Sequence, residues 1–103
     1  MSTRDSGGPR DPSIDDVDED AIVDQLSDLI GFIARALVDE PDEVKVEVLE
    51  EDDDPALIFE LTVAPDDLGK VIGRDGRTAR AMRTLLAATS ARQRRRAVLE
   101  IAE

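Results

Sequence analysis

The sequence contains no cysteine, histidine, tryptophan or tyrosine, and its only aromatic residues are Phe32 and Phe59. The absence of cysteine and histidine excludes disulfide bonds, thiolate nucleophiles, imidazole catalysis and the usual zinc sites. Because aromatic rings are scarce, the core must be aliphatic and platforms for stacking nucleotide bases are few. No apolar run approaches the length of a membrane span, and the N-terminus lacks the apolar segment of a signal peptide. We therefore expect a cytoplasmic protein.

The composition that remains is that of one small soluble domain. The chain has 103 residues, of which 41% are hydrophobic and 37% are charged. Its carboxylates fall in acidic runs and on expected helix surfaces, with no evident apolar pocket that would shift a pKa. We therefore expect a protein that is not an enzyme, that needs no cofactor or metal, and that has no small-molecule substrate.

Charge is distributed very unevenly along the chain. The net charge is −12, but residues 1–54 carry four Lys/Arg against 19 Asp/Glu, whereas residues 55–103 carry nine against six. All nine of those cations lie within residues 70–96, where Asp75 is the single acid. Such a local basic patch is the footprint of polyanion binding, whatever the net charge. We expect the binding site for such a partner in the second half of the chain.

The first 20 residues differ in composition from the rest. They are rich in glycine, proline, serine and aspartate and show no apolar periodicity. Because such a segment cannot bury enough apolar surface to fold, we expect a disordered acidic tail over residues 1–20 and a folded domain over residues 21–103. The tail either serves solubility alone or competes with a polyanion for the basic patch.

The folded part alternates between helical and strand patterns. Residues 21–38 carry apolar side chains at helical spacing, between Asp20 as an N-cap and Pro41. Residues 44–49 and 57–63 alternate between apolar and other side chains, as the two strands of a hairpin do. The remaining elements are a short helix over 65–72, a longer helix over about 77–91 and a closing strand over 97–102. Three strands and three helices predict an α+β fold with helices covering one face of a three-stranded sheet, although the partner of the closing strand stays open.

A glycine turn between the last two helices organises the basic region. Gly73 and Gly76 bracket Arg74 and Asp75, and glycine at such corners lets the backbone turn sharply and approach another backbone closely. A turn of this kind exposes amide groups at a helix start, where the helix dipole favours an anion such as phosphate. Asp75 puts a negative charge inside the turn, which either weakens phosphate binding or caps the following helix.

The helix after the turn has two faces. Arg77 and Arg80 lie one turn apart on one side, and Arg83 lies further round at the same spacing. The opposite, apolar stripe consists of Ala79, Met82 and Leu86. We expect the apolar face to pack on the domain and the basic face to meet a polyanion.

The segment Val71-Ile72-Gly73-Arg74-Asp75-Gly76-Arg77 resembles the GXXG signature of KH RNA-binding domains, whose loop clamps backbone nucleotides. The order of elements is similar to the type II arrangement, in which an extra helix and strand precede the strand-helix-helix-strand core. As a free-standing domain, the chain resembles the small bacterial KH proteins of the KhpA family in the segments 36–39, 63–67 and 69–73. This resemblance implies single-stranded RNA binding, self-association, and pairing with a KhpB-like KH protein. It also implies a role as an RNA chaperone or post-transcriptional regulator linked to cell elongation and division.

The same resemblance assigns roles to the residues of the turn. Gly73 and Gly76 would be the loop glycines, while Val71 and Ile72 would line an apolar floor under the bases. The two variable loop positions would meet the sugar-phosphate backbone, and the first two arginines of the helix would follow the phosphates. The RNA-binding residues implied in this way are Lys70, Val71, Ile72, Gly73, Arg74, Asp75, Gly76, Arg77 and Arg80.

Other interpretations stay open beside this one. A lone G-x-x-G also occurs in turns that bind nothing, and helical arginines are often simply solvated. The chain could instead be a protein-interaction or dimerisation module with little intrinsic RNA affinity. A DNA-binding helix-turn-helix is a further alternative, but its helical bundle needs no three strands. The basic segment 92–96, where type II domains place a loop bordering the groove, is equally consistent with phosphate contact and with solubility.

Overall fold

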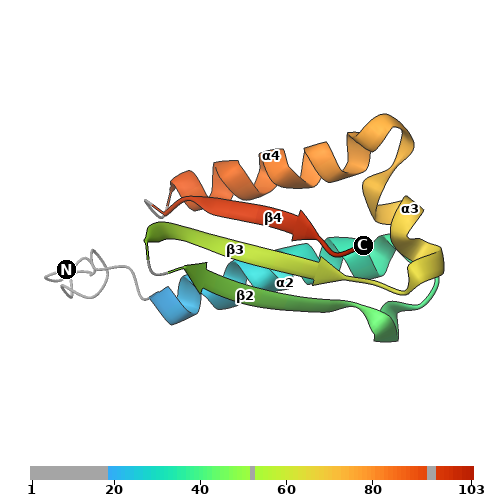
Figure 1. The fold of residues 1–103 in the computed structure, drawn as a ribbon, viewed down its shortest axis with the longest axis horizontal. Coiled ribbons are helices and arrows are strands. Elements are labelled where there is room, and N and C mark those ends of the chain that lie inside the picture. The colour runs from blue at the N-terminus through green and yellow to red at the C-terminus, as the bar shows by residue number, and fades with distance from the viewer. Residues whose placement is uncertain (1–18, 52, 93–94) are drawn as a thin grey trace, which may run out of the picture.

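The computed structural model describes residues 19–51, 53–92 and 95–103 (Figure 1). Most of the expected tail, residues 1–18, lies outside this description. Glu19 and Asp20 already belong to the first helix, α2 (Glu19–Leu37). The expectation that Asp20 is the N-cap of this helix is therefore wrong, because Asp20 lies inside it.

Helix α2 packs against the sheet through a single stripe. Ile22, Leu26, Ile30 and Ala34 recur every four residues, and all four are buried. This spacing brings them onto one side of an α-helix, so the stripe can lie flat on a sheet. A turn of 3-10 helix at Pro41–Glu43 then leads into the first strand.

The sheet has three strands in the order β2-β3-β4. Strand β2 (Lys45–Glu51) and strand β3 (Asp54–Thr62) form the expected antiparallel hairpin. Strand β4 (Ala97–Ile101) pairs parallel to β3, which settles the pairing that the sequence left open. A helical crossover between β3 and β4 makes this parallel return possible.

Three helices cover one face of the sheet, as expected for a type II KH arrangement (Figure 1). Helix α3 (Leu68–Ile72) follows a 3-10 turn at Pro65–Asp67, and helix α4 (Arg77–Ala91) follows the glycine turn. The central strand β3 lies beneath the helices and carries the fully buried side chains Leu57, Phe59 and Leu61. No helix in the described part of the chain is both long enough and apolar enough to cross a bilayer.

The other face of the sheet is open and acidic. Glu47 pairs with Glu60, and Glu60 pairs with Glu100, so three glutamates form a row across β2, β3 and β4. Successive strand residues point to opposite faces, so this row lies opposite the helices. This row of like charges disfavours a polyanion on the open face.

Candidate nucleic-acid interface

The turn between α3 and α4 has an unusual backbone. Three of its residues have positive φ: Gly73 (77°), Asp75 (58°) and Gly76 (74°). The segment Arg74–Gly76 forms a 3-10 turn, in which the Gly76 amide donates to the Gly73 carbonyl oxygen at 3.1 Å. The turn is thus an ordered corner that projects from the body of the domain.

The two glycines are required for different reasons. A Cβ on Gly73 would overlap the Thr78 side chain and lie 2.9 Å from the Thr78 amide nitrogen. A Cβ on Gly76 would meet only the Arg80 guanidinium, at 3.9 Å. Gly73 is needed for both conformation and close packing, whereas Gly76 is needed only for its left-handed conformation. The Gly76 corner faces open space, where a ligand backbone can approach.

Asp75 does not cap helix α4. The N-cap position belongs to Gly76, and no side chain in the described part of the chain makes the capping hydrogen bond. The Asp75 side chain is exposed, while its carbonyl oxygen accepts a hydrogen bond from Arg80 Nη2 at 3.3 Å. Of the two roles considered for Asp75, the capping role is excluded.

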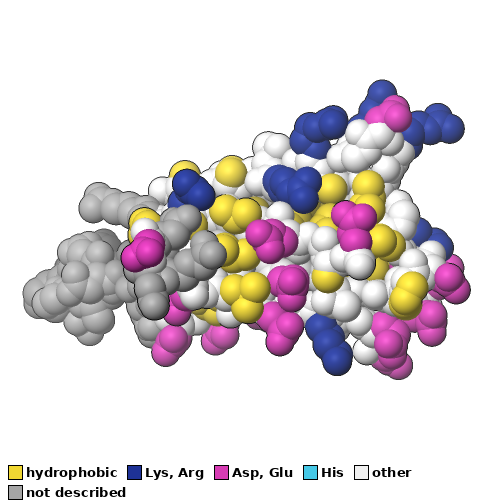
Figure 2. All heavy atoms as spheres, in the orientation of Figure 1, with side chains coloured by type: hydrophobic (Ala, Val, Ile, Leu, Met, Phe, Trp, Pro, Cys, Tyr) yellow, Lys and Arg dark blue, Asp and Glu magenta, His cyan; other side chains and the backbone are white. Residues whose placement is uncertain are grey.

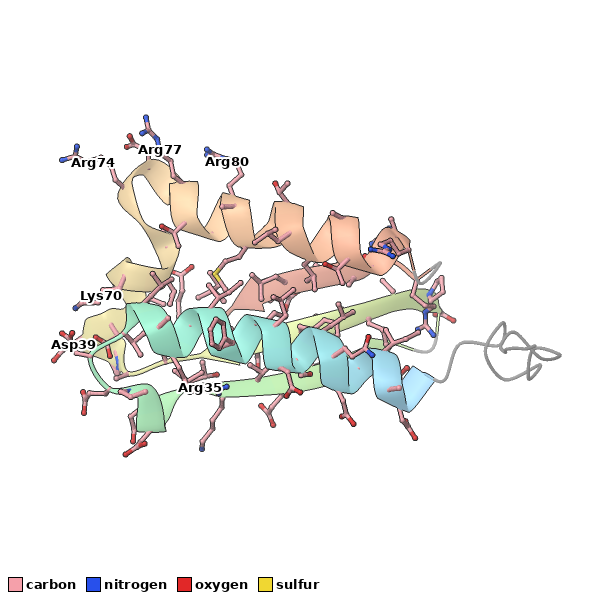
Figure 3. The ribbon with its side chains drawn as sticks, turned by 180° about the vertical axis from the view of Figure 1, so that it is seen from behind. Arg35, Asp39, Lys70, Arg74, Arg77 and Arg80 are labelled. Atoms are coloured by element: carbon pink, nitrogen blue, oxygen red, sulfur yellow. The ribbon has the colours of Figure 1, made fainter. Side chains whose placement is uncertain are left out.

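The arginines of the turn and of α4 gather along one edge of the molecule. Arg74, Arg77 and Arg80 are exposed and project from the same end of the helical layer (Figure 3). In the space-filling view, cationic side chains gather at this edge, while most acids lie over the middle and the opposite edge (Figure 2). The charge segregation of the sequence is therefore also a segregation in space.

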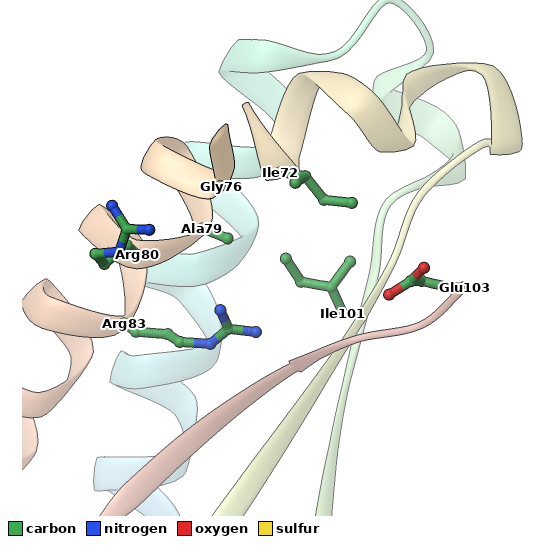
Figure 4. A pocket seen from close by; sticks show the side chains of 7 residues that line it. All are labelled: Ile72, Gly76, Ala79, Arg80, Arg83, Ile101 and Glu103. Carbon is green, nitrogen blue, oxygen red and sulfur yellow. The ribbon is translucent and has the colours of Figure 1, made fainter. Parts of the chain in front are cut away.

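A cleft of about 280 Å³ opens between this edge and strand β4 (Figure 4). Its apolar surface comes from Ile72 of α3, Ala79 of α4 and Ile101 of β4, and Ile72 and Ile101 point toward one another. The full set of lining residues is Ile72, Gly76, Ala79, Arg80, Arg83, Ile101 and Glu103. The cleft thus combines an apolar floor with charged side chains.

Sequence reasoning missed four of these residues as parts of the site, and it expected one of them, Ala79, only in the packing stripe of α4. Arg83 was expected on the helix but without a role; its Nε donates to the Leu99 carbonyl oxygen at 3.2 Å, which ties α4 to β4. Ile101 and Glu103 reach the cleft only because β4 returns beside β3. No local signal marks them, although the odd-numbered positions of the closing strand share the face of buried Leu99.

Two predicted site residues are placed elsewhere. Val71 is fully buried in the core, so the prediction that it lines the floor is wrong. Helical geometry turns Val71 inward when Ile72 turns to the cleft. Lys70 points away from the arginine edge (Figure 3), and its Nζ forms ion pairs with Asp39 at 3.1 Å and Asp67 at 3.4 Å.

Asp67 is the buried centre of this second cluster. Its Oδ2 accepts a hydrogen bond from the Glu40 amide at 3.0 Å, which ties the segment after α2 to the start of α3. Burial raises the pKa of Asp67, but hydrogen bonds from the Asp39 and Glu40 amides and from Lys70 outweigh this effect and leave the pKa below its ordinary value. The pKa of Lys70 is raised, mainly by its hydrogen bonds to Asp39 and Asp67. This cluster supports α3 and lies apart from the cleft.

The basic segment 92–96 leaves α4 at the end opposite the glycine turn (Figure 1). Residues 93 and 94 lie outside the described part of the chain. The Arg95 guanidinium is directed to the hairpin, where it donates to the Pro55 carbonyl oxygen at 2.6 and 3.1 Å and lies 4.0 Å from Glu50. Arg95 therefore joins the connection between α4 and β4 to the β2–β3 hairpin.

Comparison with known proteins agrees with this geometry. Residues 27–101 match the family model described as "KhpA/KhpB, KH domain". The chain is 50% identical over 76 residues to the RNA-binding protein KhpA of Halalkalibacterium halodurans, covering 74% of this chain and 97% of that protein. It is 53% identical over 74 residues to KhpA of Borreliella burgdorferi, covering 72% and 88%. No solved structure matches it significantly. The family match and these identities show that the chain belongs to the KhpA/KhpB family of KH-domain proteins.

Proposed function

We propose that this protein is a non-catalytic module that binds about four nucleotides of single-stranded RNA in the cleft between α3, α4 and β4. The observation that carries the proposal is the cleft itself, in which an apolar floor lies beside exposed guanidinium groups. Its relatives in Halalkalibacterium and Borreliella are named RNA-binding proteins, which supports the same role here.

The chemistry of the side chains suggests which of them would contact the phosphates and which would contact the bases. Guanidinium groups bind phosphate through charge-assisted, paired hydrogen bonds, so Arg74, Arg77 and Arg80 would follow the sugar-phosphate backbone. The aliphatic pair Ile72 and Ile101 would contact the bases. Because none of the described residues that line the cleft is aromatic, we expect weak affinity that falls steeply with salt.

The proposed interface differs from the predicted one in a few positions. Val71 is not part of the proposed interface because it is buried in the core. Lys70 is not part of it because it forms ion pairs with Asp39 and Asp67. Arg83 and Ile101 join it as cleft residues. The residues of the proposed interface are Ile72, Gly73, Arg74, Asp75, Gly76, Arg77, Arg80, Arg83 and Ile101.

A double substitution at the turn tests this proposal. Arg74→Asp removes an exposed cation, and Gly76→Asp places a carboxylate in open space at a left-handed position that aspartate tolerates. We expect the fold to persist and affinity for a six-nucleotide RNA to fall at least about tenfold, as the loss of one charge-assisted hydrogen bond would cause. Fluorescence anisotropy measures the affinity, and circular dichroism checks the fold.

The matched control changes the charge equally elsewhere. Lys45→Asp with Gln25→Asp alters two exposed residues on β2 and α2, outside the cleft. This control should bind RNA nearly as well as the wild type. If the turn variant binds no more weakly than the control, the cleft is not the RNA site.

We propose the finer parts of the function from the family alone. By its membership of the KhpA/KhpB family, the protein would act in the cytoplasm as an RNA chaperone or post-transcriptional regulator, with a KhpB-like KH protein as partner. A link to cell elongation or division would follow from the same family. Co-purification of a KhpB-like protein with the tagged chain, before and after ribonuclease treatment, tests whether the partnership is direct.

A second candidate function is that of a protein-interaction or dimerisation module. The observation that favours it is the exposure of two large apolar side chains on the helical layer, Phe32 of α2 (70% exposed) and Leu85 of α4 (50% exposed). Light scattering of the wild type and of Phe32→Ser distinguishes the candidates. A dimer that Phe32→Ser dissociates, and that forms equally with and without RNA, would favour this second function.

A further inference from the structure

One residue of the cleft does not fit a site for phosphate alone. Glu103 lines the cleft together with Arg80 and Arg83 (Figure 4). Among the described residues it forms no ion pair, so its carboxylate is not committed to these arginines. A carboxylate repels phosphate, so its presence in the cleft calls for a different ligand group.

The position of Glu103 indicates which part of a nucleotide it would meet. Arg80 and Arg83 of α4 lie on one wall of the cleft, whereas Glu103 follows β4 on the other wall, next to Ile101. A strand of RNA that places its phosphates on the arginines directs its bases across the apolar floor toward β4. Glu103 would therefore face a base edge.

A carboxylate selects among bases by the donors that they offer, because it is an acceptor only when ionised. Guanine presents two adjacent donors, N1–H and the N2 amino group, which together match both oxygens of a carboxylate. Adenine and cytosine offer one amino group each, and uracil offers a single imino group. Guanine is the base that Glu103 can bind through two parallel hydrogen bonds.

Arg83 supplies the complementary group on the other wall. Its Nε is held by the Leu99 carbonyl oxygen at 3.2 Å, which fixes the guanidinium within the cleft. A guanidinium has five N–H donors, so this bond leaves it able to donate to the O6 of a purine. A donor and an acceptor thus border the same apolar floor.

We propose that Glu103 is a specificity-determining residue that makes the cleft prefer guanine over the other bases. This inference rests on the proposed RNA-binding function and deepens it by naming the base. Each good bidentate pair of hydrogen bonds favours the correct base over a wrong one by about 1–3 kcal/mol of binding free energy. Replacing one uridine by guanosine should therefore strengthen binding about tenfold.

The experiment uses the full chain and five labelled RNAs of six nucleotides. One is all uridine, and the others replace one central uridine by guanosine, inosine, adenosine or cytidine. We expect guanosine to bind about tenfold more tightly than uridine, and inosine, which lacks the N2 amino group, to lose most of this gain. In Glu103→Gln the preference for guanosine, taken as the ratio of the affinities of this variant for the guanosine and all-uridine RNAs, should fall to about twofold or less.

Glu100→Gln is the matched control. It removes the same charge from the same strand, at an exposed position on the open face of the sheet. This variant should keep the full preference for guanosine. If all five RNAs bind equally, or if Glu103→Gln keeps the preference, the inference is overturned and the RNA-binding proposal stands. If none of the five binds, both are overturned.

Discussion

Gly73 and Gly76 lie three residues apart, but the structure needs glycine at these two positions for different reasons. Both have positive φ, which costs a residue with a Cβ about 1–2 kcal/mol. Only at Gly73 does a Cβ also collide with Thr78. The spacing G-x-x-G thus combines one packing constraint with one purely conformational constraint.

The first prediction follows from this inequality. Gly73→Ala should lower the free energy of unfolding by about 3 kcal/mol or more, because the collision adds to the cost of the left-handed conformation. Gly76→Asn should lower it by less than about 1 kcal/mol, because asparagine tolerates this conformation. Urea titrations followed by circular dichroism measure both values. Equal losses at the two positions would show that packing does not distinguish them.

Asp67 carries the second prediction at the residue scale. Its folded-state pKa is lowered, so its contribution to stability is present above its unfolded pKa and is lost as pH falls through the folded value. Asp67→Asn should therefore lower the melting temperature at pH 7. The difference from the wild type should shrink as pH falls below about 4. Thermal melts between pH 3 and 8 measure this difference.

The neighbouring Asp66 is the control for Asp67. It is exposed, whereas Asp67 is buried and bonded to the segment after α2. Asp66→Asn should leave the melting temperature nearly unchanged across the same range. An effect of Asp67→Asn that does not depend on pH would mean that the loss of charge is not its cause.

At the scale of elements, the sheet has two chemically opposite faces. The inner face packs on the helices, and the outer face carries the row Glu47, Glu60 and Glu100. Like charges directly opposite one another destabilise a sheet by a few tenths to about 1 kcal/mol per pair. The central member of the row meets two such neighbours.

The third prediction is that Glu60→Lys stabilises the domain. It replaces two repulsive pairs by two attractive ones, so we expect a gain of about 1 kcal/mol and a rise of several degrees in melting temperature. Differential scanning calorimetry measures the rise, which should diminish at high salt because the pairs are exposed. Glu43→Lys, at an exposed position in the 3-10 turn before β2 and outside this row, serves as the control. No rise at low salt would contradict this account.

For helix α4, the sequence predicted the bounds and the buried face but not the contacts with other elements. Its bounds at Arg77–Ala91 and its buried residues Ala79, Met82 and Leu86 agree with the apolar period of the sequence. The contact between Arg83 and Leu99 did not follow from that period, because these residues lie 16 positions apart on two different elements. Periodicity predicts which face is buried but not which neighbour the other face meets.

At the scale of the whole molecule, charge is separated into an arginine edge and acidic surfaces. The separation lets a chain of net charge −12 offer a local site for a polyanion. Residues 1–18, which lie outside the described structure, carry five aspartates and two arginines and so a net charge of −3. We propose that this tail competes with RNA for the arginine edge.

The fourth prediction tests the tail. Deletion of residues 1–18 leaves α2 whole and should strengthen RNA binding about threefold at 10 mM salt. At 150 mM salt we expect little change, because the Debye screening length falls to about 8 Å. Anisotropy titrations at both salt concentrations measure the effect. A full-length variant with the five aspartates changed to asparagine should reproduce it. Equal affinities at low salt would leave the tail a solubility segment.

The sequence by itself determined what depends on near neighbours: the helix and strand periods, the glycine corner and the arginine face beyond it. It was enough for the family and the α+β class, because these rest on local patterns and on their order along the chain. Only the tertiary structure decided that β4 runs parallel to β3, that Asp39 pairs with Lys70, and that Glu103 enters the cleft. Each of these features either joins segments that lie far apart along the chain or depends on how the helices and strands pack together. Such contacts come from burying apolar surface between elements, and no local pattern encodes the partner.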